Sequence, residues 1–171
     1  MISDVRVLDR TIAGYLSAYL VAVPIWLLYP VSVPRAPMAI HDVWTYGIAI
    51  VRTVDPPTNC LPSMHVALAT LAALVVRRHD RVAGNLLLGT AALITWSTLA
   101  IEQHWVADGL LGMALAWIAD QFWLGRLPDT MFRPIPRIWH GVWLSLYIGA
   151  VLVLMSGWWL GWLPLELLEH G

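Results

Sequence analysis

A histidine and an aspartate one helical turn apart are the first residues in this chain that could do chemistry. His104 and Asp108 are four residues apart, so their side chains share one face if the segment is helical. The carboxylate would then accept a hydrogen bond from one imidazole nitrogen, which fixes the tautomer and leaves the other nitrogen as a base or nucleophile. Because His-x-x-x-Asp is a weak pattern by itself, a polar pair that only satisfies its own hydrogen bonds at a helix start is an equal alternative.

A second segment, Pro62-Ser63-Met64-His65, is typical of a helix start that could hold an anion. Proline is favoured in the first helical turn, and the N–H groups of that turn attract an anion such as phosphate. Ser63 adds a hydroxyl donor, and His65 could give a proton to a leaving oxygen. These two side chains do not face each other along a helix, so a Ser–His nucleophile pair is not expected. An ordinary helix start with an interfacial histidine is the simpler alternative.

Other polar residues lie near the ends of apolar runs. Arg35 can clamp a phosphate with two hydrogen bonds, although a charge that anchors the end of a membrane span is an equally good interpretation. Ser97 closes an uncharged run at the same end of the predicted bundle. Cys60 is interpreted as a small packing residue, because a cysteine phosphatase would need arginine six positions later, where the chain has valine. Asp120 is expected to cap its helix or to pair with Arg126.

The composition predicts a membrane protein. Of the 171 residues, 59% are hydrophobic and 12% are charged, whereas a soluble domain carries about 25% charged residues. The chain also holds 11 tryptophans, and tryptophan favours the membrane–water interface. A net charge of −1 argues against a nucleic-acid-binding protein, which would show a basic surface. High apolar content combined with low net charge excludes a disordered chain.

Runs of apolar residues set the predicted architecture. A helix needs about 20 apolar residues to cross a hydrocarbon core about 30 Å thick. The sequence therefore predicts an all-α integral membrane bundle of about five transmembrane helices, at residues 11–31, 62–77, 82–101, 104–124 and 141–163. A short stretch near 38–52 cannot span, and it is predicted to form an interfacial helix. We expect a single domain over residues 1–171.

The distribution of arginine predicts the orientation of this bundle. The predicted spans place eight arginines on the face that holds the N-terminus and two on the opposite face. The eight are Arg6, Arg10, Arg77, Arg78, Arg81, Arg126, Arg133 and Arg137, and the two are Arg35 and Arg52. Because cytoplasmic loops carry an excess of basic residues, we expect a multi-pass protein of the cell membrane with a cytoplasmic N-terminus. The residues able to do chemistry then fall at the extracytoplasmic end.

The combined motifs resemble those of the type 2 phosphatidic acid phosphatase superfamily. That family carries Pro-Ser-x-His followed by Ser-Arg-x5-His-x3-Asp. Here the motifs stand as Pro62-Ser63-Met64-His65 and as Ser97-Thr98-x5-His104-x3-Asp108. The resemblance covers roughly residues 25–115, and it includes Gly112 at the end of the family's Asp-x-x-x-Gly pattern.

Two departures from the family pattern remove cationic phosphate clamps. Thr98 stands where the family's third motif has arginine. The family's upstream Lys-x6-Arg-Pro motif is degenerate, because Pro34-Arg35 is in reversed order and the chain has no lysine. In lacking the third-motif arginine, the sequence is similar to the inositol phosphorylceramide synthase branch.

The resemblance implies a role for each candidate residue. His104 would be the nucleophile that forms a phosphohistidine, and Asp108 would orient it and stabilise its positive form. His65 would be the general acid on the leaving oxygen. The phosphoryl oxygens would be held by the N–H groups of the helix start and by Arg35, Ser63 and Ser97. No metal ion or other cofactor is implied.

We therefore predict a membrane phosphatase that hydrolyses a lipid phosphate or diphosphate, of isoprenoid or glycerolipid type, with its active site at the extracytoplasmic face. Its partners would be the lipid phosphate substrate and the bilayer, and no nucleic acid. A phosphotransferase that moves a phospho-headgroup to a lipid or polyol alcohol is the close alternative, favoured by Thr98. A non-catalytic membrane bundle is the alternative from another class, because polar residues inside a bundle can line a path.

Overall fold

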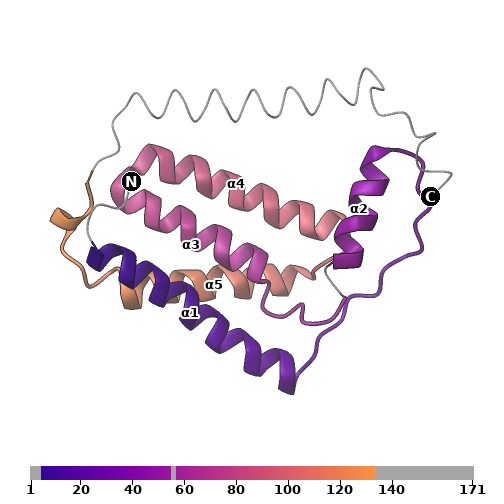
Figure 1. Cartoon of the computed structure of the whole chain (residues 1–171), viewed down its shortest axis with the longest axis horizontal. Helices are drawn as coiled ribbons and strands as arrows, with labels where there is room; N and C mark the ends of the chain where they lie inside the picture. The colour runs from indigo at the N-terminus through magenta and orange to yellow at the C-terminus, as the bar shows by residue number, and fades with distance from the viewer. Residues whose placement is uncertain (1–4, 55–56, 134–171) are drawn as a thin grey trace. The chain divides into compact units, whose positions relative to one another are not determined.

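The computed structural model describes residues 5–54 and 57–133. All of the regular secondary structure in these residues is helical. In order the helices are α1 (Val5–Leu28), α2 (Val43–Val54), α3 (Met64–His79), α4 (Arg81–Ala100), α5 (Val106–Trp123) and the short 3-10 helix η1 (Asp129–Met131) (Figure 1). No strand occurs within these residues, which confirms the all-helical prediction for them. The predicted span at 141–163 lies outside the described residues.

The chain divides into two compact units. One comprises residues 1–35 and 57–135, and the other comprises residues 36–56 and 136–171. The first unit contains α1, α3, α4 and α5, and the second contains α2. The expectation of one domain over the whole chain stays a prediction.

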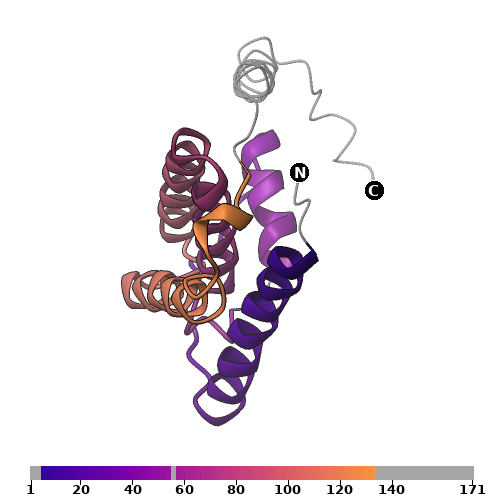
Figure 2. The same cartoon turned by 90° about the vertical axis from the view of Figure 1, so that its left-hand side faces the viewer.

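Helix α3 lies at the centre of the first unit and contacts α4, α5 and α1, while α1 also contacts α5. The larger core cluster gathers apolar side chains of α1, α3, α5 and the segment after α5, namely Val7, Leu71, Val75, Ala116, Ala119, Leu124 and Phe132. Figure 2 shows the indigo α1 next to the salmon α5, with the two helix axes inclined to each other. Packing against three other helices therefore fixes α3, whose first residues belong to the motif segment at 62–65.

A one-residue turn joins α3 to α4. Asp80 ends α3 and also caps α4, since its carboxylate accepts hydrogen bonds from the N–H groups of Val82 and Ala83, both at 2.9 Å. Gly84 permits the close approach that follows, because a Cβ there would lie 2.2 Å from the Cα of Arg77. The two helices run in opposite directions, so the start of α3 and the end of α4 meet at one end of the unit (Figure 1).

The pairing of Asp120 corrects our expectation. Its carboxylate is buried and accepts two hydrogen bonds from the guanidinium of Arg78 on α3, at 2.8 and 2.6 Å. Arg126 instead lies over the ring of Phe122, with its guanidinium carbon 4.3 Å from the ring centre. The physical reason is that Asp120 faces α3, and a buried carboxylate needs a partner on the inside of the bundle.

Two of the described helices, α1 and α4, are long and apolar enough to cross a membrane. Only 22% of the most apolar window of α1 and 17% of that of α4 are buried within the structure, whereas a core helix of a soluble protein would be mostly buried. Helix α3 has 16 residues and α5 has 18. The number of spans that the sequence suggests therefore stays a prediction.

The second unit contributes a capped helix where the sequence predicts an interfacial one. Asp42 accepts a hydrogen bond from the N–H of Thr45 at 2.8 Å, and the Thr45 hydroxyl accepts one from the N–H of Asp42 at 3.0 Å. This reciprocal cap starts α2 at Val43, within the predicted stretch near 38–52. Arg52, one of the two arginines predicted on the face opposite the N-terminus, donates to the carbonyl of Ala36 at 2.9 Å.

Candidate active site

The turn between α4 and α5 positions His104. The carbonyl of Thr98 accepts hydrogen bonds from the N–H groups of Gln103 at 2.9 Å and His104 at 3.3 Å. The N–H of Trp105, which precedes the first residue of α5, donates to Oδ2 of Asp108 at 2.8 Å. His104 therefore lies just before α5, whereas the sequence predicted it inside the helix. The cap formed by Asp108 nevertheless brings the two side chains together.

The start of α3 is attached to the same part of α5. The N–H of Ser63 donates to the carbonyl of Asp108 at 3.0 Å. Ser63 is fully buried and is the N-cap of α3, with its hydroxyl accepting from the N–H of Val66 at 3.5 Å. Gly112 makes this approach possible, because a Cβ at that position would lie 2.5 Å from the carbonyl oxygen of Ser63. The first turn of α3 is thereby fixed beside the first turns of α5.

The two histidine rings lie edge to face across this junction. The ring centres of His65 and His104 are 5.8 Å apart and the ring planes are inclined at 63°. Nδ1 of His104 lies 3.5 Å from Oδ2 of Asp108, a distance suited to an ion pair when the imidazole is protonated. His104 and Asp108 are buried, at 8% and 1% exposed, whereas His65 is exposed. The site thus has a buried imidazole–carboxylate pair with a second imidazole at its mouth.

The segment that leads to Arg35 is held against the loop before α3. The N–H of Val33 donates to the carbonyl of Pro57 at 3.1 Å, and the N–H of Cys60 donates to the carbonyl of Val31 at 3.2 Å. The side chain of Arg35 is half-buried. Because Cys60 comes shortly before the α3 cap, these bonds place the chain around Arg35 on the side of the bundle that carries the histidines.

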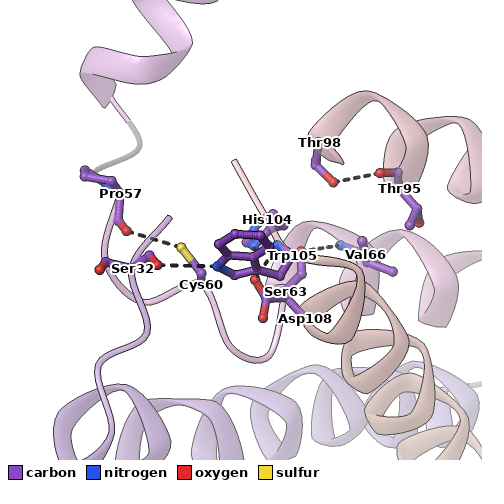
Figure 3. A network of polar contacts seen from close by, with 10 residues as sticks. All are labelled: Ser32, Pro57, Cys60, Ser63, Val66, Thr95, Thr98, His104, Trp105 and Asp108. Atoms are coloured by element: carbon purple, nitrogen blue, oxygen red, sulfur yellow. Dashed lines mark hydrogen bonds and ion pairs between the residues drawn. The ribbon is translucent and has the colours of Figure 1, made fainter. Parts of the chain in front are cut away.

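Trp105 adds a side-chain link to the same segment. Its indole N–H donates to the carbonyl of Ser32 at 3.4 Å (Figure 3). The indole is about half exposed, so it forms part of the rim beside His104. Sequence reasoning did not single out Trp105, although its position between two motif residues was a usable signal.

The predicted phosphate contact from Ser97 has little structural support. The side chain of Ser97 is exposed, and its hydroxyl donates to the carbonyl of Ile94 at 2.8 Å within α4. The next residue, Thr98, is buried and donates to the carbonyl of Thr95 at 2.9 Å (Figure 3). Thr98, in the position of the family's arginine, therefore lies inside the bundle and supports the turn that carries His104.

Cys60 is a site neighbour that sequence reasoning missed. One ligand atom each from Cys60, His104 and Asp108 lies within 4.8 Å of the others. Cys60 is 2% exposed, and its thiol donates to the carbonyl of Pro57 at 3.3 Å. The available signal was its place two residues before Pro62, at the start of the motif. These three side chains could hold a metal ion.

The arrangement suits acid–base and nucleophilic chemistry on a phosphoryl group. One imidazole is oriented by a buried carboxylate, and a second imidazole is near enough for one phosphoryl group to contact both rings. The N-terminus of α3 adds the positive end of a helix dipole. Side chains of this kind, brought together at one end of a helical unit, define a candidate phosphoryl-transfer site.

The comparison with known families agrees with this site. The family model of the PAP2 superfamily matches residues 1–121, and the chain belongs to this superfamily. Its members are generally phosphatases or phosphotransferases, which supports a phosphatase-type function and a phosphate-bearing substrate. No curated protein and no solved structure matches the chain. The similarity to the inositol phosphorylceramide synthase branch stays a prediction.

Proposed function

We propose that this protein is a membrane phosphatase that hydrolyses a lipid phosphate or diphosphate through a phosphohistidine on His104. One observation carries the proposal: the rings of His65 and His104 are 5.8 Å apart, and Asp108 lies against His104. A phosphoryl group between the rings would contact a nucleophile on one side and a proton donor on the other.

In the first half of the reaction, a ring nitrogen of His104 attacks phosphorus and the bond from phosphorus to the leaving oxygen breaks. His65 gives its proton to that oxygen, so the lipid alcohol leaves neutral. The N–P bond makes the His104 ring positive, and the carboxylate of Asp108 stabilises this charge at short range. For a diphosphate, the leaving group is the lipid monophosphate.

In the second half, His65 takes a proton from water and the resulting hydroxide attacks phosphorus. The N–P bond breaks, inorganic phosphate leaves and His104 returns to its starting form. A general acid or base of this kind contributes about 10²–10⁴ in rate. The phosphoryl oxygens are held by Arg35 and by the N-terminus of α3, which Ser63 caps. Of the predicted phosphate contacts, Ser97 is the weakest because its hydroxyl bonds within α4.

The exposed apolar surface supports a lipid environment. On α1, Leu20 is 76% exposed and Leu27 is 77% exposed, and on α4 Trp96 is 71% exposed. Large apolar side chains exposed along whole helices indicate contact with lipid or with another protein. In a bilayer, the alkyl chains of the substrate stay among these side chains while the headgroup reaches the site.

The ends of the helices support an extracytoplasmic site. Seven of the eight arginines assigned to the cytoplasmic face lie among the described residues. They are found at the start of α1, around the α3–α4 turn, and at or beyond the end of α5. Figure 1 shows these helix ends together, with the start of α3 and the start of α5 at the opposite end of the unit. We therefore propose a cytoplasmic N-terminus and a site facing outward.

The proposal is tested with the full-length protein purified in detergent, using phosphatidic acid and an isoprenyl diphosphate and measuring phosphate release. His104→Ala is expected to lose activity on every substrate. His65→Ala should lose about 10²–10⁴-fold on an alkyl phosphate but much less on an aryl phosphate, whose leaving group needs no proton. His79→Ala is the matched control, because His79 ends α3 at the other end of the helix. Full activity in His104→Ala would contradict the proposal.

Transfer to an alcohol is the second candidate, and the buried Thr98 favours it. Without a cation at that position, the phosphoryl group is held less tightly, and an acceptor other than water has more access. Addition of diacylglycerol or a polyol to the same assay separates the two reactions. A phosphorylated alcohol formed at the expense of free phosphate identifies a phosphotransferase.

A further inference from the structure

The proposed phosphoryl transfer gives no role to Cys60, the only cysteine in the chain. Its sulfur, a nitrogen of His104 and a carboxylate oxygen of Asp108 are mutually within 4.8 Å. The three residues are 2%, 8% and 1% exposed. They come from two segments, the loop before α3 and the start of α5, that the backbone bond from Ser63 to Asp108 holds together.

A thiolate, an imidazole and a carboxylate form a donor set that suits Zn²⁺, with a fourth position left open. Ligand bonds of about 2.0–2.3 Å place two ligand atoms of one tetrahedral zinc about 3.3–3.5 Å apart. Nδ1 of His104 and Oδ2 of Asp108 are already 3.5 Å apart. The sulfur would need to come closer to the other two ligand atoms by about 1.3 Å or less, with loss of its hydrogen bond to Pro57.

The local charges also suit a divalent cation. The thiolate of Cys60 and the carboxylate of Asp108 carry two negative charges, which balance the two positive charges of Zn²⁺. The site with the ion bound is therefore nearly neutral, as a buried group should be. The thiol loses its proton when the metal binds. The N–H of Trp105 holds the carboxylate of Asp108 in place at 2.8 Å, as donors around metal ligands commonly do.

We propose that Cys60, His104 and Asp108 bind a thiophilic divalent cation such as Zn²⁺, and that the bound ion inhibits the enzyme. The ion takes up the imidazole and the carboxylate that phosphoryl transfer uses, so binding and catalysis exclude each other. The inhibitory half rests on the proposed function, whereas the metal site itself does not. The ion is an inhibitor here, so a chelator is expected to leave hydrolysis unchanged or to raise it.

The binding test uses the full-length protein in detergent and Cd²⁺, whose thiolate complexes absorb in the ultraviolet by charge transfer. Because the chain has one cysteine, such a band reports Cys60 alone. We expect a band that saturates at one ion per chain and is absent in Cys60→Ser. His104→Ala and Asp108→Asn should each weaken binding at least about tenfold, whereas His79→Ala should not. Helix content measured for each variant separates loss of a ligand from loss of the fold.

Two outcomes would overturn the metal site. One is the absence of a saturable band in the native protein. The other is a band with unchanged affinity in both His104→Ala and Asp108→Asn, which would show that the thiol binds the ion without them.

The inhibition test compares hydrolysis with and without Zn²⁺ for the native protein and for Cys60→Ser, each relative to its own metal-free rate. We expect the native protein to be inhibited and Cys60→Ser to need at least about tenfold more Zn²⁺. Equal sensitivity would contradict the inhibitory role. If Cd²⁺ binds as expected but no lipid phosphate is hydrolysed, the proposed function fails and the metal site stands. If Zn²⁺ does not inhibit hydrolysis and Cd²⁺ gives no absorption band, the metal site fails and the proposed function stands.

Discussion

At the scale of single residues, Asp108 has the most connections in the site. Its carboxylate caps α5 through Trp105 and faces Nδ1 of His104, and its backbone carbonyl accepts from Ser63. One residue therefore contacts the start of α5, the ring of His104 and the N-cap of α3. This connection explains why a buried carboxylate is tolerated at 1% exposure, since its polar atoms have partners.

Asp108→Asn is expected to remove the negative charge of Asp108 while keeping its cap of α5. The amide oxygen can still accept from the N–H of Trp105, so stability should change by less than about 1 kcal/mol. The negative charge that stabilises positive His104 is lost, so kcat should fall about 10²-fold or more. Thermal unfolding and phosphate release measure the two effects. A native kcat in this variant would show that the reaction does not need the charge of Asp108.

The sequence predicted the central residues of the site but not all of their neighbours. The spacing of His104 and Asp108 predicted that their side chains lie close together, and the cap at the start of α5 keeps them so even though His104 precedes the helix. The sequence did not predict that Cys60 lies beside His104 and Asp108, because its position depends on how the loop of residues 57–63 packs against α5. The choice between Ser97 and Thr98 depends on the rotation of α4, which an apolar run on all sides does not specify.

At the scale of elements, contact between α3 and α5 decides whether the two histidines meet. Gly112→Ala would place a Cβ 2.5 Å from the carbonyl oxygen of Ser63. The two helices must then move apart, and overpacking of this kind costs about 1–3 kcal/mol. We expect a lower unfolding temperature together with a large loss of activity.

Gly89→Ala is the matched control for that substitution. Gly89 is also inside a helix, but nothing lies within 4 Å of a Cβ added there. Alanine should be neutral or stabilising by up to about 1 kcal/mol, because it is the better helix former. If the two alanine variants behaved alike, the close approach at Gly112 would not position the site.

The ion pair between Arg78 and Asp120 joins α3 to α5 at the end away from the histidines. Asp120→Ala leaves a partly buried guanidinium without its carboxylate, and we expect a loss of the order of 3 kcal/mol in the free energy of unfolding. The double variant Arg78→Met with Asp120→Leu should recover most of that loss. Chemical unfolding of the native protein and these two variants tests this, and a double variant no more stable than Asp120→Ala would contradict the pairing.

The same pair explains why α3 extends past the end of the predicted span. The predicted span ended at residue 77, where charges begin, but α3 continues to His79. The helix can continue because Asp120 neutralises Arg78 inside the bundle. Hydropathy alone cannot report such a partner, since it lies on another helix 42 residues away.

At the scale of the whole molecule, the arginine distribution predicts which end of the bundle faces the cytoplasm. The test introduces one cysteine at a time into a Cys60→Ala background and labels intact cells with a membrane-impermeant thiol reagent. We expect labelling of Thr53→Cys on α2 and none of His79→Cys at the end of α3. Labelling at position 79 alone would reverse the orientation and place the proposed site in the cytoplasm.

Composition and apolar runs predicted the helical class, and the PAP2 family match agrees with the motifs. They did not determine the number of spans, because α1 and α4 are the only helices of the described residues that are both long and apolar enough to cross a membrane. Helices α3 and α5 carry the charged and polar residues that build the site and the Arg78–Asp120 pair. The charged and polar residues of the candidate site and of the ion pair thus lower the mean hydropathy of this part of the chain.

Trapping of the phosphoenzyme is the sharpest test of the proposed phosphohistidine on His104. The full-length protein would be mixed with a lipid phosphate carrying a radioactive phosphoryl group and quenched in base, where phosphohistidine survives. We expect label on the peptide that contains His104 in the native protein and in His79→Ala, stable in base and lost in acid, and no label in His104→Ala. Label on another residue, or rapid hydrolysis by His104→Ala, would contradict it.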